Sequence, residues 1–121
     1  MERTRFIEHR GRRILVLDYS GIRDGEEALR EIENSRRVVA LQAPGSLLVL
    51  TNVKDARYNK DIVQAMKELA AHNAPYVKAS AVVGMSGLHR VAYQAIILFS
   101  KRRIQVFDTP EEGLDWLVAQ P

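Results

Sequence analysis

The chain has 121 residues, a length that fits one domain and leaves no room for two. Hydrophobic residues make up 46% of it and charged residues 27%, which excludes a disordered chain and indicates a globular protein with its own core. Cysteine is absent, so disulfides, thiol nucleophiles and cysteine–metal sites are excluded as well.

The charge pattern argues against two classes of partner. The formal net charge is +3, and the basic residues come in short runs among acidic ones, without the sustained basic stripe of a nucleic-acid binder. No apolar stretch approaches the ~20 residues that a membrane-spanning helix needs. The first residues, MERTRFIEHRGRR, are too charged for a secretory signal. We therefore expect a cytoplasmic protein that has no membrane span and binds no nucleic acid.

Two short strands open the predicted fold, at residues 6–9 and 13–19, and they form a hairpin. The second strand contains the apolar run ILVL, which is typical of a strand inside a sheet. Asp24 stands three residues before Glu27, the spacing of a capping box. This pair predicts the start of a helix that continues to about residue 41.

Three further units, each a strand followed by a helix, complete the predicted chain. Their strands are short apolar runs, and their helices carry apolar residues at helical spacing. A Thr-Pro-Glu-Glu sequence at 109–112 is a strong signal for the start of the last helix. The expected strands span 46–52, 77–84 and 104–107, and the helices that follow them span 59–72, 87–101 and the residues after Thr109.

These elements predict a single α/β domain over residues 1–121, with a five-stranded mixed sheet and four helices. Strands that alternate with single helices pair in parallel through right-handed crossovers, and the first strand is antiparallel to its neighbour. Periodicity leaves the strand order open. A flavodoxin-like order would place helices on both faces of the sheet, whereas a sequential order would place all of them on one face.

The segments LVLDYSG, LLVLTNVKD and above all the closing VFDTPEEGLDWL resemble the SpoIIAA-like branch of the STAS domains. These domains are named for sporulation anti-anti-sigma factors and sulfate transporters, and the similarity in element order covers essentially the whole chain. The resemblance implies a βα superhelix of sequential strands, with the helices on one face. It also implies a non-enzymatic regulatory or binding role.

One part of the resemblance is missing from this chain. Regulatory STAS proteins carry a phosphorylatable serine in an Asp-Ser-Ser-Gly-like turn before the second crossover helix. The corresponding turn here, residues 55–60, reads DARYNK and contains no serine. We therefore do not expect a phosphoserine switch at this turn.

Ligands of open α/β sheets gather beyond the carboxyl ends of the parallel strands. We therefore expect polar residues at this edge to form a surface for a ligand or a protein partner. No metal-ligand spacing or catalytic motif occurs among them, so we assign no catalytic residue, metal or cofactor. The candidate residues are Asp18, Tyr19, Asn52, Tyr58, Asn59, Ser86, His89 and Arg90.

The expected helix at 87–101 is apolar beyond the stripe that one sheet contact needs. Tyr93, Ile97 and Leu98 widen its apolar face. This width has two readings, contact with neighbouring helices or a surface that forms a homodimer or binds a protein partner. We carry the interface reading as a hypothesis.

Three classes of function remain open on these residues. The first is a STAS-like regulatory or protein-interaction module without enzymatic activity. The second is a protein that binds a small apolar or anionic ligand, in a pocket near Tyr58 and Tyr93. The third is an enzyme, which would need Asp18, Ser86 and His89 within hydrogen-bond reach of one another.

Overall fold

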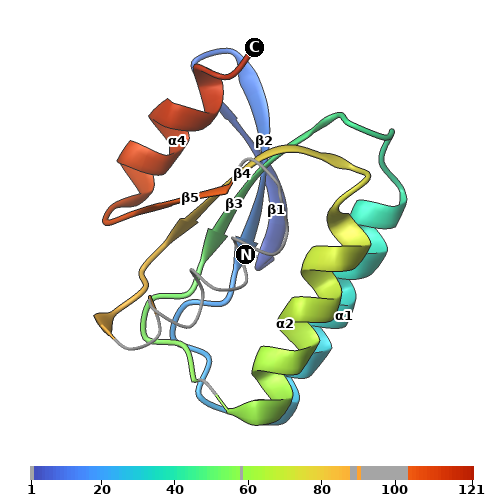
Figure 1. Ribbon diagram of the computed structural model, residues 1–121, viewed down its shortest axis with the longest axis vertical. Helices are drawn as coiled ribbons and strands as arrows, with labels where there is room; N and C mark the ends of the chain where they lie inside the picture. The colour runs from blue at the N-terminus through green and yellow to red at the C-terminus, as the bar shows by residue number, and fades with distance from the viewer. Residues whose placement is uncertain (1, 58, 88–89, 91–103) are drawn as a thin grey trace.

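The computed structural model describes residues 2–57, 59–87, 90 and 104–121 (Figure 1). The expected helix at 87–101 falls almost entirely outside these residues. In the described part the chain has three helices, where we expected four over the whole chain. The strands are β1 (Thr4–His9), β2 (Arg12–Asp18), β3 (Leu47–Asn52), β4 (Val77–Val83) and β5 (Ile104–Phe107), and the helices are α1 (Gly25–Ala40), α2 (Lys60–Asn73) and α4 (Pro110–Val118).

The five strands form one mixed sheet in the order β1-β2-β3-β4-β5. β1 pairs with β2 in antiparallel fashion, and each of the other neighbouring pairs is parallel. This arrangement confirms the mixed five-stranded sheet and the antiparallel first strand, and it shows that the strand order is sequential. The carboxyl ends of β2, β3 and β4 consequently meet at one edge.

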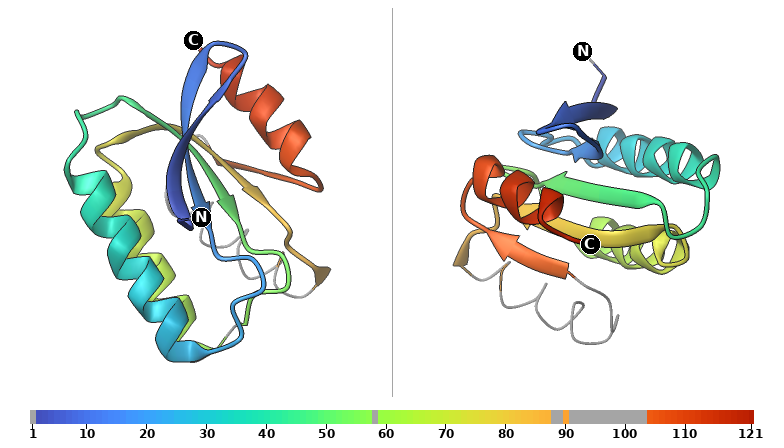
Figure 2. Two further views of the ribbon diagram at one scale, coloured as in Figure 1. Left: turned by 180° about the vertical axis from the view of Figure 1, so that it is seen from behind. Right: turned by 90° about the horizontal axis from the view of Figure 1, so that it is seen from above.

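The helices cover both faces of the sheet, so the expectation that all of them pack on one face is wrong. Alternate residues of β2 and β3 point to opposite faces. Leu15 and Val49 belong to the apolar core under α1 and α2, whereas Ile14 and Leu48 belong to a second core that includes Leu117 of α4. Figure 2 shows α4 on the opposite side of the sheet from α1 and α2.

The hairpin of β1 and β2 holds the carboxyl end of α4. Arg12 donates hydrogen bonds to the carbonyls of Val118 (3.2 Å) and Gln120. A cation at a helix carboxyl end is favourable, because it meets carbonyls that have no partner within the helix. His9 adds a contact of 2.9 Å between its Nε2 and Oδ1 of Asp115.

All three described helices begin at a side chain that accepts a hydrogen bond from the first turn. Asp24 accepts from the backbone N–H of Glu27 (3.1 Å), and Thr109 accepts from that of Glu112 (3.3 Å). These two contacts confirm the helix starts predicted from the sequence. α2 begins in the same way at Asn59, which accepts from the N–H of Ile62 (2.8 Å).

Candidate functional site

The loops at the carboxyl edge of the sheet are joined by backbone hydrogen bonds. The N–H of Tyr19 donates to the carbonyl of Asn52 (2.8 Å), and that of Gly21 donates to Lys54 (2.8 Å). The N–H of Val53 in turn donates to the carbonyl at the end of β4, at 2.9 Å. The backbone hydrogen bonding between the parallel strands thus continues into the loops that follow them. These loops are therefore held next to one another at the carboxyl edge.

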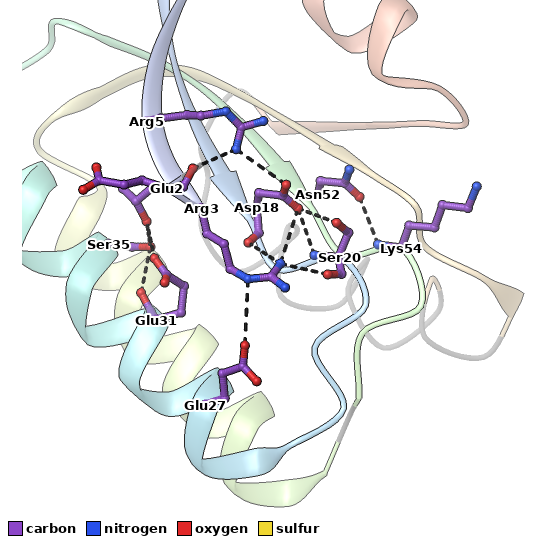
Figure 3. Close-up of polar contacts among 11 residues, drawn as sticks. Glu2, Arg3, Arg5, Asp18, Ser20, Glu27, Glu31, Ser35, Asn52 and Lys54 are labelled. Atoms are coloured by element: carbon purple, nitrogen blue, oxygen red, sulfur yellow. Dashed lines mark hydrogen bonds and ion pairs between the residues drawn. The ribbon is translucent and has the colours of Figure 1, made fainter.

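Asp18 ends β2 and lies at the centre of a polar cluster (Figure 3). Its Oδ1 accepts hydrogen bonds from the backbone N–H (3.0 Å) and the hydroxyl of Ser20. Arg5 Nη1 lies 3.5 Å from Oδ2, and Arg3 Nη1 lies 4.0 Å from Oδ1 and donates to the carbonyl of Ser20 at 2.8 Å. Both arginines belong to the first strand or its start, so Asp18 ties that edge strand to the loop after β2.

The surroundings of Asp18 keep its carboxylate ionised. Partial burial raises the pKa, but the hydrogen bonds from Ser20 and the charges of Arg5 and Arg3 outweigh it, so the pKa is lowered overall. A carboxylate with a lowered pKa is a weak general base at neutral pH. The hydrogen bond from the Ser20 hydroxyl to Asp18 is therefore better suited to shaping this turn than to activating the hydroxyl.

Tyr19 is not part of the exposed edge, which corrects its assignment as a surface residue. Its side chain is 4% exposed and lies under α1. The hydroxyl makes a 2.6 Å hydrogen bond with Oγ of Ser35, a residue that is 0% exposed. Burial in this apolar core raises the pKa of the phenol, so Tyr19 stays neutral.

Sequence reasoning missed the buried hydroxyl chain to which Tyr19 belongs. Oγ of Ser35 lies 2.9 Å from Oγ1 of Thr4, which donates to the carboxylate of Glu31 at 2.7 Å. The sequence did contain a signal, because Ser35 interrupts the apolar stripe that runs along the buried face of α1. A polar residue at such a position needs a buried partner.

The two candidate asparagines are occupied by local backbone contacts. Asn52 Oδ1 accepts from the N–H of Lys54 at 3.0 Å, and Asn59 is the N-terminal cap of α2. Such contacts are typical of asparagine in turns and caps, where they shape the backbone. Both residues lie at the predicted edge, but their side-chain oxygens accept hydrogen bonds from nearby backbone N–H groups.

Other candidate residues lie apart from the cluster around Asp18. Ser86 is exposed, and its carbonyl accepts from the N–H of Arg90 at 3.1 Å. The Arg90 guanidinium lies 3.4 Å from Oδ1 of Asp108, beyond the end of β5. The remaining candidates, Tyr58, His89, Tyr93, Ile97 and Leu98, lie outside the described residues.

Comparison with known proteins identifies the architecture. No family model matches the chain, and no curated protein matches it. Among solved structures, the chain is similar to an uncharacterized protein of the DUF3478 family with a SpoIIAA-like fold from Shewanella loihica PV-4. The match has a TM-score of 0.75 and 15% sequence identity, and it covers 94% of this chain and 91% of the other. The chain has a SpoIIAA-like fold.

The SpoIIAA-like fold agrees with the resemblance read from the sequence. At 15% identity the similarity establishes the architecture alone. The matched protein is itself described as uncharacterized, so it brings no activity to this chain. The chemistry must be argued from the residues themselves.

Among the described residues, a groove lies between α1 and α2. It has a volume of about 280 Å³. The apolar side chains of Leu29, Ile32 and Leu69 line it, together with charged residues along both helices. Leu29 is 40% exposed at this groove.

The described residues offer no site for catalytic chemistry by a metal. They contain no group of three histidine or acidic side chains that could hold a metal ion. Within the same residues, no helix is long and apolar enough to cross a membrane. Around Asp18, the side chains of Ser20, Arg3 and Arg5 are in contact with its carboxylate, and these contacts guide the assignment of function.

Proposed function

We propose that this protein is a non-enzymatic, STAS-like module that acts by binding another protein chain. The observation that carries the proposal is the set of contacts that the Asp18 carboxylate makes at the carboxyl edge. It is held by Ser20, Arg3 and Arg5, and its pKa is lowered. Because the charge of the Asp18 carboxylate is balanced by neighbouring residues, these contacts support a structural role for Asp18. A partner protein would then be bound by other surfaces of the domain.

An enzymatic role receives less support from the same residues. A general base works best when its pKa lies near the operating pH, and the surroundings of Asp18 move its pKa in the opposite direction. Ser86 is exposed at a different loop. In the described residues no contact joins Ser86 to Asp18, and His89 lies outside those residues, so a catalytic set of these three stays without support.

Binding of a small ligand is the second candidate, and the groove between α1 and α2 is a place where the described residues could hold one. Pockets for small molecules usually have volumes of about 300–1,000 Å³ and enclose most of the ligand. The groove has about 280 Å³, at the lower limit of that range. Its shape suits a side chain of a partner better than an enclosed molecule. The predicted pocket near Tyr58 and Tyr93 lies outside the described residues and stays a prediction, as does the cytoplasmic location.

Native mass spectrometry of the purified protein separates these two functions. The interaction module is expected to give masses of the bare 13.7 kDa chain or of its multiples, with no added small molecule. Protein denatured in acid serves as the control for the mass of the chain alone. A small molecule retained in a one-to-one ratio by most chains would overturn the proposal in favour of ligand binding.

A further inference from the structure

β1 is the end strand of the sheet, and one side of its backbone is open (Figure 2). The carbonyl of Arg3 accepts from the N–H of Asp18 (2.9 Å), so these residues form a hydrogen-bonded pair. Such pairs occur at every second residue of an antiparallel ladder. The register on β2 therefore turns the N–H and C=O groups of Thr4, Phe6 and Glu8 away from β2. No hydrogen bond to these groups occurs among the described residues.

Apolar side chains lie beside this open edge. Phe6 and Val38 of α1 are half-buried and pack against the core under α1. The β1 side of α1 is marked by Glu27, whose Oε1 lies 4.0 Å from Nε of Arg3. Val38 and Leu41 follow Glu27 by about three and four helical turns, so they lie on the same side of the helix. Leu41 is 83% exposed there.

We propose that β1 pairs with β1 of a second copy of this chain, antiparallel across a twofold axis at Phe6, so that the two sheets join into one. This pairing rests on the proposed interaction role and names its partner and its surface. A twofold axis uses the same surface on both copies, so the surface must be complementary to itself. An axis at Phe6 sets Thr4 of each copy opposite Glu8 of the other. All three residues with open backbone groups then meet one another.

The open backbone groups favour this register over its neighbours. An axis at Arg5 sets arginine opposite arginine, and an axis at Glu8 sets carboxylate opposite carboxylate, which destabilises a strand pair. An axis at Thr4 or Ile7 leaves one end of the strand without a partner. The axis at Phe6 pairs the whole strand and sets no like charges directly opposite.

The charged side chains of β1 permit this register. Arg5 comes opposite Ile7 of the second copy. Arg3 comes opposite His9. The two Arg5 side chains are diagonal neighbours across the axis, but each lies 3.5 Å from Oδ2 of its own Asp18, which offsets their repulsion.

One like-charge contact opposes the pairing, and it makes the register testable. Thr4 donates to the carboxylate of Glu31 at 2.7 Å, and Glu8 comes opposite Thr4 of the second copy. The carboxylate of Glu8 therefore approaches that of the second copy's Glu31. Removal of the charge at Glu8 is thus expected to strengthen the dimer.

The carboxyl ends of the two α1 helices meet near the axis. Oγ1 of Thr4 lies 2.9 Å from Oγ of Ser35. Phe6 comes two residues later, which is about 6.6 Å along the strand or about four residues along the helix. The axis therefore crosses α1 in its last turn, and Leu41 of each copy lies within about one turn of it. Burial of these leucines removes apolar surface from water, which favours association.

Two arginines lie in the same part of α1. Arg36 lines the groove toward α2, away from β1. Arg37 has a side chain that is 77% exposed, and both arginines pair with Glu33 within the helix, at 3.7 and 3.6 Å. Their charges are also favourable beside the carbonyls at the end of α1. Both arginines can therefore keep these partners when two copies meet.

The size of the joined edge indicates a weak dimer. β1 has 6 residues and is about 20 Å long, and α1 adds a second layer to the strip that is covered. Such a strip buries on the order of 800 Å² in total, in the range of weak and transient interfaces. Backbone hydrogen bonds give strand additions of this kind their affinity. Sedimentation is therefore best followed over a wide range of protein concentration.

Analytical ultracentrifugation of the full chain tests the pairing through Glu8. The native protein is expected to move from the mass of one chain toward that of two as concentration rises. Glu8→Pro removes an N–H that points away from β2, so the ladder within the chain is kept, and it is expected to weaken association by about tenfold or more. Glu8→Gln is the matched control. It keeps the N–H and loses the charge, so it is expected to associate at least as tightly as the native protein.

Leu41→Glu tests the same axis from the side of α1. Leu41 is 83% exposed in the single chain, so the fold tolerates the substitution, and association is expected to weaken by about tenfold. Circular dichroism checks that all variants are folded. If Glu8→Pro does not fold, Leu41→Glu decides in its place.

A single cysteine tests the position of the axis, because the native chain contains none. Only a residue on the axis meets its own counterpart, at a Cα separation that a disulfide can bridge. Phe6→Cys is therefore expected to form a disulfide-linked dimer on oxidation. Gln105→Cys is the control, since Gln105 is exposed on β5 at the other end of the sheet. Equal cross-linking of the two variants overturns the inference.

Two results in the centrifuge also overturn it. One is a dimer that Glu8→Pro and Leu41→Glu leave unchanged, or that Glu8→Gln weakens as much as Glu8→Pro does. The other is a native protein that stays monomeric at the highest concentration, which would leave the edge to a strand of a different protein. These failures concern the partner and the edge, whereas a retained small molecule in the mass spectrum would overturn the proposed function.

Discussion

Gly84→Ala is expected to lower the free energy of unfolding by about 3 kcal/mol or more. Gly84 follows β4 with a φ of +88°, a conformation that side chains with a Cβ rarely adopt. A Cβ at this position would also lie 2.5 Å from the backbone nitrogen of Lys54. Backbone atoms cannot move aside cheaply, so the loops after β3 and β4 would have to separate. Urea unfolding followed by circular dichroism measures the effect.

Gly45→Ala provides the matched control for this substitution. Gly45 also has a positive φ, of +66°, but a Cβ there would meet no atom within 4 Å. It is expected to cost only the conformational strain, about 1 kcal/mol. Equal losses in the two variants would contradict the close approach of the two loops at the carboxyl edge.

Leu117→Ala is expected to destabilise the protein by about 2–5 kcal/mol, the usual range for a buried leucine. Leu117 of α4 is 0% exposed and packs against the second face of the sheet. Leu41→Ala, at an exposed position, is expected to change the free energy of unfolding by less than about 0.5 kcal/mol. Thermal unfolding of the two variants beside the native protein measures both values. A small effect at Leu117 would contradict the packing of α4 against the second face of the sheet.

The pairing of the strands was predicted correctly from the sequence pattern and their sequential order from the family resemblance, whereas the placement of the helices on one face was wrong. The apolar run in β2 correctly indicated an inner strand. That same run also contradicted a one-sided arrangement, because its alternate residues, such as Ile14 and Leu15, point to opposite faces and both need cover. The apolar stripe of α4 carries no information about which face it joins. Only the three-dimensional path of the chain decides that.

The candidate site was predicted in its location but not in its internal contacts. Asp18 and Asn52 lie at the expected edge, whereas Tyr19 is buried. Alternation along β2 continues past the end of the strand, so Tyr19 follows Leu15 and Leu17 onto the face under α1. Arg3 could not be assigned from the sequence, because its contact with Asp18 depends on the register of the hairpin.

The free energy of unfolding of Asp18→Asn as a function of pH tests most directly the claim that the carboxyl edge is structural. The substitution keeps the shape but removes the charge that Ser20, Arg3 and Arg5 hold, so it is expected to cost about 1–2 kcal/mol at neutral pH. The pKa of Asp18 is lowered in the folded chain, so the native advantage is full above the ordinary aspartate value of 3.8 and is lost as the pH falls through the lowered pKa.

Asp108→Asn is the control for this measurement, because Asp108 is 79% exposed and its ion pair with Arg90 is worth little. It is expected to change the free energy of unfolding by less than about 0.5 kcal/mol. A stability of Asp18→Asn below that of the native protein at neutral pH, converging with it in acid, is the result that the account predicts. An Asp18→Asn protein as stable as the native chain, or more stable, would contradict it and would indicate a carboxylate kept for function at the expense of stability.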